Sequence, residues 1–297
     1  MKRNLNNSTQ TQCSLDAMST NMNNPLPIVG IVTRLTRPVF YLNRVLEGLL
    51  KQRDVVIEWS IITQIPLTRE HQNCIGRAEE NGIKVVVTYT KSEIKLGALA
   101  NMGVQAITTP YVLLHDDDDA LINDCIHTML NYFSSEDIVA VVCHGAIINE
   151  SGKNPSKLNY VLSPGRKQVD RTSLQQNNLI LTNTLLYTRA VFDRIGGYPS
   201  DVDVGEDWLF NLDLIANGNI NILPKVCAAI YVRKNADIPK EKNTVVAMHD
   251  AHLQMAYKIR ETYNLPKDII KKNKLTTKIL CRIDRITYKF GGWFFPR

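Results

Sequence analysis

An apolar run from Tyr111 to Leu114 ends, after His115, at four consecutive carboxylates, Asp116 to Asp119. Four adjacent acids repel one another, so a fold tolerates them where a cation compensates their charge or where water solvates them. A strand that ends in such a cluster presents several oxygens at one sheet edge, which suits a hard divalent ion such as Mg²⁺ or Mn²⁺. Ligands of open α/β sheets bind outside the carboxyl ends of the strands, where these acids would lie. The stretch therefore favours a metal site, with a solvated acidic turn as the alternative.

The chain before these acids alternates between strand and helix patterns. Short β-branched or apolar runs predict strands, and apolar residues at helical spacing predict the helices between them. The predicted strands are residues 28–33, 55–63, 84–88 and 111–115, and the predicted helices are residues 39–50, 69–81 and 97–107. This alternation predicts an α/β fold in which a mainly parallel sheet carries helices on both faces.

The second half of the chain is less regular. Its predicted strands are residues 138–143, 145–148 and 179–187, and its predicted helices are residues 190–195, a helix starting near Glu206, and residues 244–263. A polar stretch with Gly and Pro, residues 149–176, is predicted to be irregular. A long irregular segment in a compact domain is usually a functional or a mobile loop, so this one is expected to shape substrate specificity.

Composition and charge narrow the class of protein. No stretch approaches the roughly 18 to 20 uninterrupted apolar residues of a membrane span, and the start has no apolar core of a signal peptide, which predicts a cytoplasmic protein. The six cysteines stand singly, as expected of reduced thiols. Residues 267–297 hold nine Lys or Arg against Asp268 and Asp284, so the net charge of +6 resides in the tail. The basic surface therefore does not indicate a nucleic-acid partner.

The pattern divides the chain into three parts. Residues 1–24, rich in Asn, Ser, Thr and Gln, are predicted to be a disordered leader, residues 25–235 the α/β domain, and residues 236–297 a helical region. In the tail, an apolar stripe is bordered by a cationic one and followed by Trp293-Phe294-Phe295. This favours an interfacial helix on an anionic membrane surface. The alternative is a helix docked on the protein's own core or on a second subunit.

Two helix starts carry residues of chemical interest. Gly97 to Gly103 opens the helix before the acidic strand, and a helix N-terminus favours an anion, although small residues there are more often packing contacts. Gly205-Glu206-Asp207 opens a later helix, where acids are favoured by the helix dipole. Beside a metal cluster, the same acids fit a second interpretation, in which one carboxylate is a general base.

Taken together, the motifs resemble family 2 glycosyltransferases of the GT-A fold over residues 25–234. They are Gly30 to Arg34 with Arg37-Pro38, Gly97 to Gly103, His115 to Asp119, Ile195 to Tyr198, and Glu206 to Trp208. The resemblance implies an inverting transfer of a sugar from a nucleotide-sugar donor, usually a UDP-sugar, with Mn²⁺ or Mg²⁺. By the same resemblance Asp116 and Asp118 are the DxD metal ligands and Asp207 is the base. The implied donor-binding residues are Thr33, Arg34, Gln64, Gly97, Asn101, Asp116, Asp117 and Glu206.

The chain departs from the family pattern at two positions. Where the second strand ends, family members commonly carry an Asp that binds the nucleoside, and this chain has Thr63-Gln64. The Gln64 amide both donates and accepts hydrogen bonds and can pair with a uracil edge. Near the end of the domain, where the family often has a metal-binding His after a Tyr, this chain has Arg233-Lys234. Either cation would neutralise diphosphate charge, or His249 or His252 would fold back, although a solvated helix face is the favoured interpretation of these two histidines.

We therefore predict a cytoplasmic enzyme, peripheral on the inner face of the plasma membrane, that transfers a sugar to a glycan or lipid-linked acceptor in cell-surface polysaccharide synthesis. The assignment to a bacterial membrane and the glycan come from the resemblance. One alternative is a non-catalytic GT-A domain that binds a nucleotide sugar or glycan, suggested by Gln64 and the missing His. A nucleotidyltransferase is a third interpretation, but the sequence has no Gly-rich triphosphate loop of the GxxxxGK[ST] kind.

Overall fold

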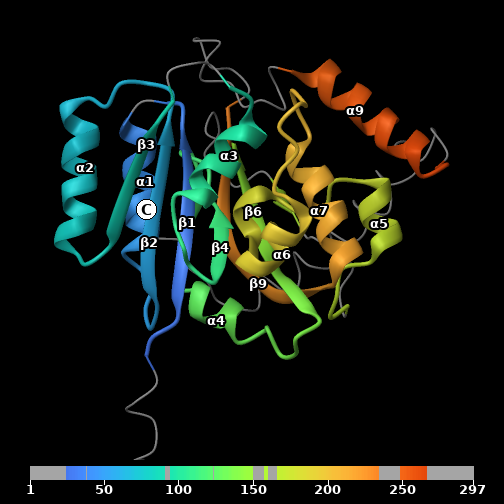
Figure 1. Ribbon diagram of the computed structural model, residues 1–297, viewed down its shortest axis with the longest axis horizontal. Helices are drawn as coiled ribbons and strands as arrows, with labels where there is room; N and C mark the ends of the chain where they lie inside the picture. The colour runs from blue at the N-terminus through green and yellow to red at the C-terminus, as the bar shows by residue number, and fades with distance from the viewer. Residues whose placement is uncertain are drawn as a thin grey trace, which may run out of the picture.

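A computed structural model describes residues 25–37, 39–90, 94–122, 124–149, 157–159, 166–233 and 248–265. Its centre is a nine-stranded sheet in the order β3-β2-β1-β4-β8-β6-β9-β5, with β7 paired to β6 (Figure 1). The strands are β1 (Ile28–Leu35), β2 (Val56–Thr63), β3 (Lys84–Tyr89), β4 (Tyr111–Leu114), β5 (Ala120–Leu121), β6 (Ile138–Asn149), β7 (Lys157–Asn159), β8 (Leu185–Thr188) and β9 (Asn219–Val232). β1, β2, β3, β4, β6 and β9 run in one direction, whereas β5, β7 and β8 run against it.

Helices cover both faces of this sheet. They are α1 (Val39–Leu49), α2 (Arg69–Glu80), α3 (Leu96–Gln105), α4 (Ile126–Leu130), α5 (Arg171–Gln176), α6 (Arg189–Ile195), α7 (Glu206–Asn217) and α9 (His249–Thr262), with a 3₁₀ turn η1 (Thr182–Thr184). One hydrophobic core joins α1, α2 and α4 to the sheet, and a second joins α3, α5, α6, α7 and α9 to the other face. The predicted architecture, a mainly parallel sheet between two helical layers, is confirmed.

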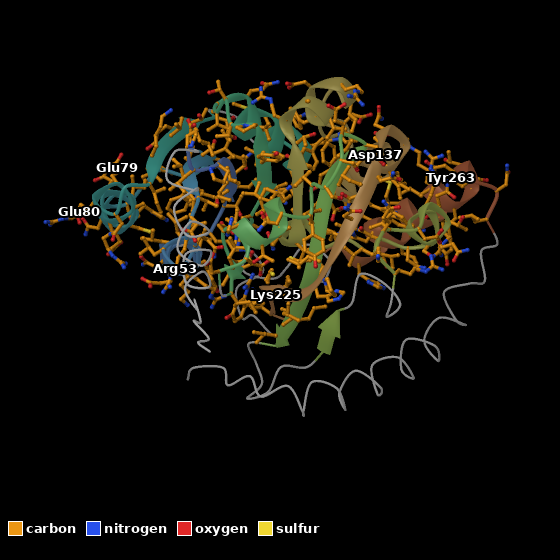
Figure 2. All side chains as sticks on the ribbon, turned by 90° about the horizontal axis from the view of Figure 1, so that it is seen from below. Arg53, Glu79, Glu80, Asp137, Lys225 and Tyr263 are labelled. Atoms are coloured by element: carbon orange, nitrogen blue, oxygen red, sulfur yellow. The ribbon has the colours of Figure 1, made fainter. Side chains whose placement is uncertain are left out.

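The long dimension of the molecule follows the order of the strands. α2 lies at one end, and α5 and α9 lie at the other (Figure 1). In the view from below, Glu79 and Glu80 of α2 and Tyr263 after α9 accordingly mark opposite ends (Figure 2).

The central strands are buried because their sequences are apolar on both faces. β1 and β2 are each exposed only at the first residue. Ile31 of β1 pairs in parallel with Trp59 of β2 on one side and with Leu113 of β4 on the other. Such continuous apolar runs are typical of parallel strands covered by helices on both sides.

The parallel arrangement brings distant segments to one edge of the sheet. β1, β2, β4 and β9 share a direction, so their carboxyl ends lie along the same edge. Arg34 near the end of β1, Gln64 after β2, Asp116 after β4 and Arg233 after β9 are therefore carried there by the topology. Residues of both halves of the chain thus meet at one place.

Several predicted elements differ from the observed ones. The predicted strand at 179–187 is β8 alone, preceded by the turn η1. The predicted irregular segment 149–176 contains β7 and also α5, which begins where the Ser173 N–H donates to the Asp170 carboxylate at 2.9 Å. A short helix with such an N-cap is set by one hydrogen bond, which periodicity over a long window does not detect.

The pairing of β6 with β9 explains the remaining differences. The predicted strands 138–143 and 145–148 are one strand, β6, and the register against β9 shifts on both sides of His144. β9 was not predicted, because Pro224 and Lys225 interrupt its apolar pattern and form part of the shift. A bulge accommodates such an interruption once a partner strand is present. The short elements β5 and α4 were also missed.

The C-terminal prediction is tested over part of its length. α9 is observed within the predicted helix 244–263, and Ile259 joins the core that α7 also lines. No helix in the described residues combines the length and apolar character needed to cross a membrane. The predicted leader 1–24 and the basic tail 267–297 lie outside the described residues, and the division into three parts stays a prediction.

We expect Gly97→Ala to destabilise the fold. Gly97 brings α3 against the segment before α7, and a Cβ there would lie 1.9 Å from the Pro199 carbonyl oxygen. Relieving this clash should cost about 1–3 kcal/mol in the free energy of unfolding, measured by urea denaturation. The matched control is Gly76→Ala in α2, where a Cβ meets nothing within 4 Å. The control should gain about 0.5–1 kcal/mol, and equal effects of the two variants would contradict the proposed close approach.

Candidate active site

Arg34 joins the acidic stretch to the start of α7. Its Nε donates to Asp116 Oδ1 at 2.8 Å, and its Nη1 donates to Glu206 Oε1 at 2.8 Å. Arg34 is only 4% exposed and Glu206 only 5%. Burial lowers the pKa of Arg34, but Asp116 and Glu206 outweigh it and raise this pKa overall. The guanidinium is therefore a fixed positive charge between two carboxylates from distant parts of the chain.

Asp117 fixes the turn after β1. Its Oδ2 accepts hydrogen bonds from the backbone N–H groups of Thr36 and Arg37 at 2.7 and 2.8 Å, and its Oδ1 lies 2.5 Å from Arg37 Nη1. Burial raises the pKa of Asp117 to about 6, although Arg37 opposes the shift. The residue is fully buried. These contacts indicate that Asp117 positions the turn, and its predicted role in donor binding stays a prediction.

Asp118 faces arginines. Its Oδ2 is ion-paired with Arg233 Nη2, and its Oδ1 lies 3.4 Å from Arg37 Nη1. Arg44 Nη1 donates to the Asp118 backbone carbonyl at 2.7 Å. Asp118 is 3% exposed and Arg233 is 5% exposed. Both side-chain oxygens of the predicted metal ligand are thus next to guanidinium groups.

Asp119 is held by uncharged donors. Asn183 Nδ2 donates to its Oδ2, and the Tyr231 N–H donates to its Oδ1 at 2.8 Å. Burial, reinforced by Asp118, raises the pKa of Asp119. Asn183 also accepts from the Asp116 N–H through Oδ1 at 2.8 Å. Asn183 was missed from the sequence, because no local pattern shows that the turn before β8 meets the end of β4.

The residues do not fit a divalent ion held by Asp116 and Asp118. The first carboxylate is paired with Arg34 and the second with Arg233, so a divalent ion would have to displace both guanidinium groups, which would stay positively charged beside it. In the described ranges, no three His, Cys, Asp or Glu side chains are placed to hold a metal ion. His249 and His252, considered as substitutes for the missing ligand, lie in the first turns of α9 and do not complete such a group.

Asp207 lies in the first turn of α7, next to Glu206. The helix starts at Gly205, which has φ +80°, a left-handed conformation suited to glycine. Asp207 Oδ2 accepts from Asn178 Nδ2 at 3.1 Å and from Thr182 Oγ1 at 3.3 Å. Burial, reinforced by Glu206, raises the pKa of Asp207 to about 6.

Asp207 is only partly buried by residue exposure, and with a pKa of about 6 its carboxylate is ionised at neutral pH, yet more basic than an ordinary aspartate. Those are the properties of a general base. Asn178 and Thr182, like Asn183, were missed from the sequence.

The other predicted donor-binding residues lie in three different places. Thr33 is fully buried, and its hydroxyl accepts from Trp59 Nε1 at 2.9 Å, so it belongs to the core. Asn101 binds both backbone polar groups of Tyr198, donating to the carbonyl at 2.8 Å and accepting from the N–H at 2.7 Å. With Gly97, it fixes the segment that leads to α7. Gln64 stays at the sheet edge, where its Nε2 donates to the Ile94 carbonyl at 2.9 Å.

Comparison with known proteins identifies the family of the chain and solved structures of similar fold. The sequence model described as glycosyl transferase family 2 matches residues 41–196, more than half of the chain. No curated protein sequence matches. S. aureus TarS 1–349 in complex with UDP-GlcNAc superposes with a TM-score of 0.59 at 14% identity, over 78% of this chain and 66% of that one. TarS 1–349 alone gives 0.58 at 13% identity, over 78% and 64%.

A third structure is the mannosyltransferase PcManGT from Pyrobaculum calidifontis in complex with GDP-Man and Mn²⁺, with a TM-score of 0.53 at 14% identity, over 70% of this chain and 58% of that one. At such identities the likeness shows the fold. The chain spans less than two thirds of each of these three structures.

We expect Asp117→Ala to be strongly destabilising. The substitution would leave the Arg37 charge and two backbone N–H groups without their buried acceptor. Breaking a buried ion pair in this way costs about 3–5 kcal/mol in the free energy of unfolding, measured by urea denaturation. Asp193→Ala is the control, because it removes an ion pair to Arg189 in which the acid is 56% exposed. The control should lose less than about 1 kcal/mol, and a similarly small loss for Asp117→Ala would refute its structural role.

Proposed function

Because the chain belongs to glycosyl transferase family 2, we propose that it transfers a sugar, with inversion, from a nucleotide-sugar donor to a hydroxyl group of a glycan or lipid-linked acceptor. The observation that carries the proposal is the link from Asp116 through Arg34 to Glu206, which sets Asp207 at a fixed place beside the acidic stretch. Cell-surface polysaccharide synthesis is the process we propose for it.

The chemistry is a single displacement. The acceptor oxygen forms a bond to the anomeric carbon while the bond from that carbon to the diphosphate oxygen breaks, and the electron pair leaves with the nucleoside diphosphate. Asp207 accepts the proton of the acceptor hydroxyl. One displacement inverts the configuration of the anomeric carbon, and no covalent intermediate on the protein is needed. A pKa of about 6 keeps Asp207 ionised at neutral pH and still able to hold a proton.

The donor is proposed to be a UDP-sugar. TarS was solved with UDP and with UDP-GlcNAc, whereas PcManGT was solved with GDP-Man, so relatives of this fold use more than one nucleotide. Gln64 follows β2 at the edge where the acidic stretch lies, and its amide can donate to and accept from a uracil edge. We propose that Gln64 binds the nucleobase of the donor and that Asp116 and Glu206 lie beside the rest of the donor.

No metal ion takes part in the displacement proposed here. PcManGT was solved with Mn²⁺, and the sequence pattern of this chain predicts Mn²⁺ or Mg²⁺. The ion pair between Asp118 and Arg233 does not fit that prediction.

We expect Asp207→Asn to abolish turnover while donor binding is retained. Release of nucleoside diphosphate from UDP-, GDP- and dTDP-sugars, with a lipid-linked acceptor present, should fall by at least about 100-fold. Because Asp207 must be ionised, the wild-type rate should also fall about tenfold per pH unit below pH 6. Asp213→Asn, an exposed position on the same helix, is the control and should keep the wild-type rate.

Three outcomes of this experiment are decisive. A wild-type rate for Asp207→Asn would show that this residue is not the base. Donor binding by the wild-type protein without release on any acceptor would favour the alternative of a non-catalytic domain. No binding and no release across the panel would refute the transferase function.

We further propose that residues 267–297 hold the enzyme on the cytoplasmic face of the membrane, through the basic stripe and the terminal aromatic residues of the sequence. Replacing Lys274, Lys278, Arg282 and Arg285 with Gln should weaken co-sedimentation with phosphatidylserine vesicles by at least about 100-fold, at roughly 1 kcal/mol for each charge. The control makes the same change at the exposed positions Lys51, Arg53, Arg69 and Arg171. Equal binding of both variants, or equal binding to neutral vesicles, would contradict the proposal.

A further inference from the structure

We propose that Arg233, together with Arg37 and Arg44, takes the place of a divalent cation and neutralises the donor diphosphate. The inference rests on the proposed function and concerns the same site. It changes Asp118 from a metal ligand into a residue that positions an arginine.

The topology brings Arg233 to the acidic stretch. Arg233 directly follows β9, which runs in the same direction as β4, so it lies at the edge where Asp118 follows β4. The sequence has Arg233 where family members often have a metal-binding His. The same sheet position therefore carries a fixed positive charge in this chain.

The Arg233 guanidinium is held from two sides. It is ion-paired with the Asp118 carboxylate, and its central carbon lies 4.8 Å from the centre of the Tyr41 ring. Both Arg233 and Tyr41 are buried. A cation held against an aromatic face and a carboxylate in this way keeps its position before any ligand arrives.

Arg44 and Arg37 surround the same aspartate. Arg44 donates to the Asp118 carbonyl, and its central carbon lies 3.7 Å from the centre of the Tyr231 ring. Arg37 Nη1 lies 3.4 Å from Asp118 Oδ1, and its buried Nε–H has no acceptor among the described residues. A buried donor without an acceptor is costly, so an anion that reached Arg37 Nε would gain a hydrogen bond there.

Electrostatics favours a diphosphate over a metal ion at this place. A divalent ion on Asp118 would have to displace Arg233 and would then lie beside the positive charges of Arg37 and Arg44, which cannot lose their protons. A diphosphate carries the opposite charge and accepts the paired N–H groups that a guanidinium presents. Arginine has five N–H donors, so orientation by Asp118 and contact with phosphate oxygens are compatible. The leaving nucleoside diphosphate gains negative charge, which fixed cations stabilise.

The first test uses the wild-type chain. Binding of UDP and of GDP is measured by calorimetry in EDTA and in Mn²⁺, beside release of nucleoside diphosphate under the same conditions. The affinity for the preferred nucleotide should be unchanged within about twofold, and turnover should persist in EDTA. Binding or turnover that requires Mn²⁺ would overturn the inference and leave the proposed function intact. No nucleotide binding in either buffer would overturn both.

The second test uses variants. Arg233→Gln should weaken nucleoside diphosphate binding by about 10- to 100-fold and leave binding of the bare nucleoside unchanged, which a purely structural role would not do. Arg233→Lys keeps the charge and should keep most of the affinity. Arg233→His supplies a metal ligand and should make binding respond to Mn²⁺. Arg53→Gln, exposed and just before β2 at the opposite sheet edge, is the control.

Removing one partner of a buried ion pair can prevent folding, so the double variant Asp118→Asn/Arg233→Gln removes both charges. It should fold and show the same loss of diphosphate affinity as Arg233→Gln. Wild-type affinity in the folded double variant would overturn the inference.

Discussion

The buried guanidinium of Arg34 is the contact on which the geometry of the site depends. It connects Asp116 after β4 with Glu206 at the start of α7, residues that are 90 positions apart in the sequence. If Arg34 were absent, the buried Glu206 carboxylate would lose its cation and would lie near the partly exposed Asp116 carboxylate, which is an unfavourable arrangement. With Arg34 present, the start of α7 is attached to the sheet by a charged contact in addition to packing. Asp207 occupies the next position on α7, so its distance from the acidic stretch is set by the rigid part of the fold.

Four consecutive aspartates are compatible with folding because each is compensated differently. Asp116 pairs with Arg34, and Asp117 accepts two backbone N–H groups and pairs with Arg37. Asp118 pairs with Arg233. Asp119 receives only uncharged donors, which fits the raised pKa of its carboxyl. The stretch is therefore not the solvated turn that its sequence offers as an alternative, because most of its side chains are buried and their charge is balanced inside the protein.

Sequence patterns predicted the elements whose signals lie within their own residues. Apolar patterns and turn signals are present in the segments that form β1, β2, β4 and α7. The motifs at Asp116 and Asp207 also lie near each other in the fold, because Arg34 joins Asp116 to Glu206. The predictions failed for β9 and for the segment before β8. These elements depend on pairing partners far along the chain and on a bulge beside His144. Contacts across those elements, such as Asn183 with Asp119, had no signal in the sequence. The sequence shows that Arg233 stands where the family often has a His. It does not show that Arg233 pairs with Asp118, because that contact depends on the register of β9.

A count of formal charges shows why arginines can serve in place of the divalent cation that the sequence pattern predicts. A divalent ion between two carboxylates forms a neutral unit. Around the same two carboxylates this chain places Arg34, Arg44 and Arg233, and Glu206 supplies a third acid, so these six groups also sum to zero, with Asp119, which has only uncharged donors, left out of the count. Arg37 and Asp117 add one charge of each sign. The field met by a diphosphate thus resembles that of a metal site in total charge, but its positive part is covalently fixed to β1, α1 and the end of β9 and does not depend on a metal supply.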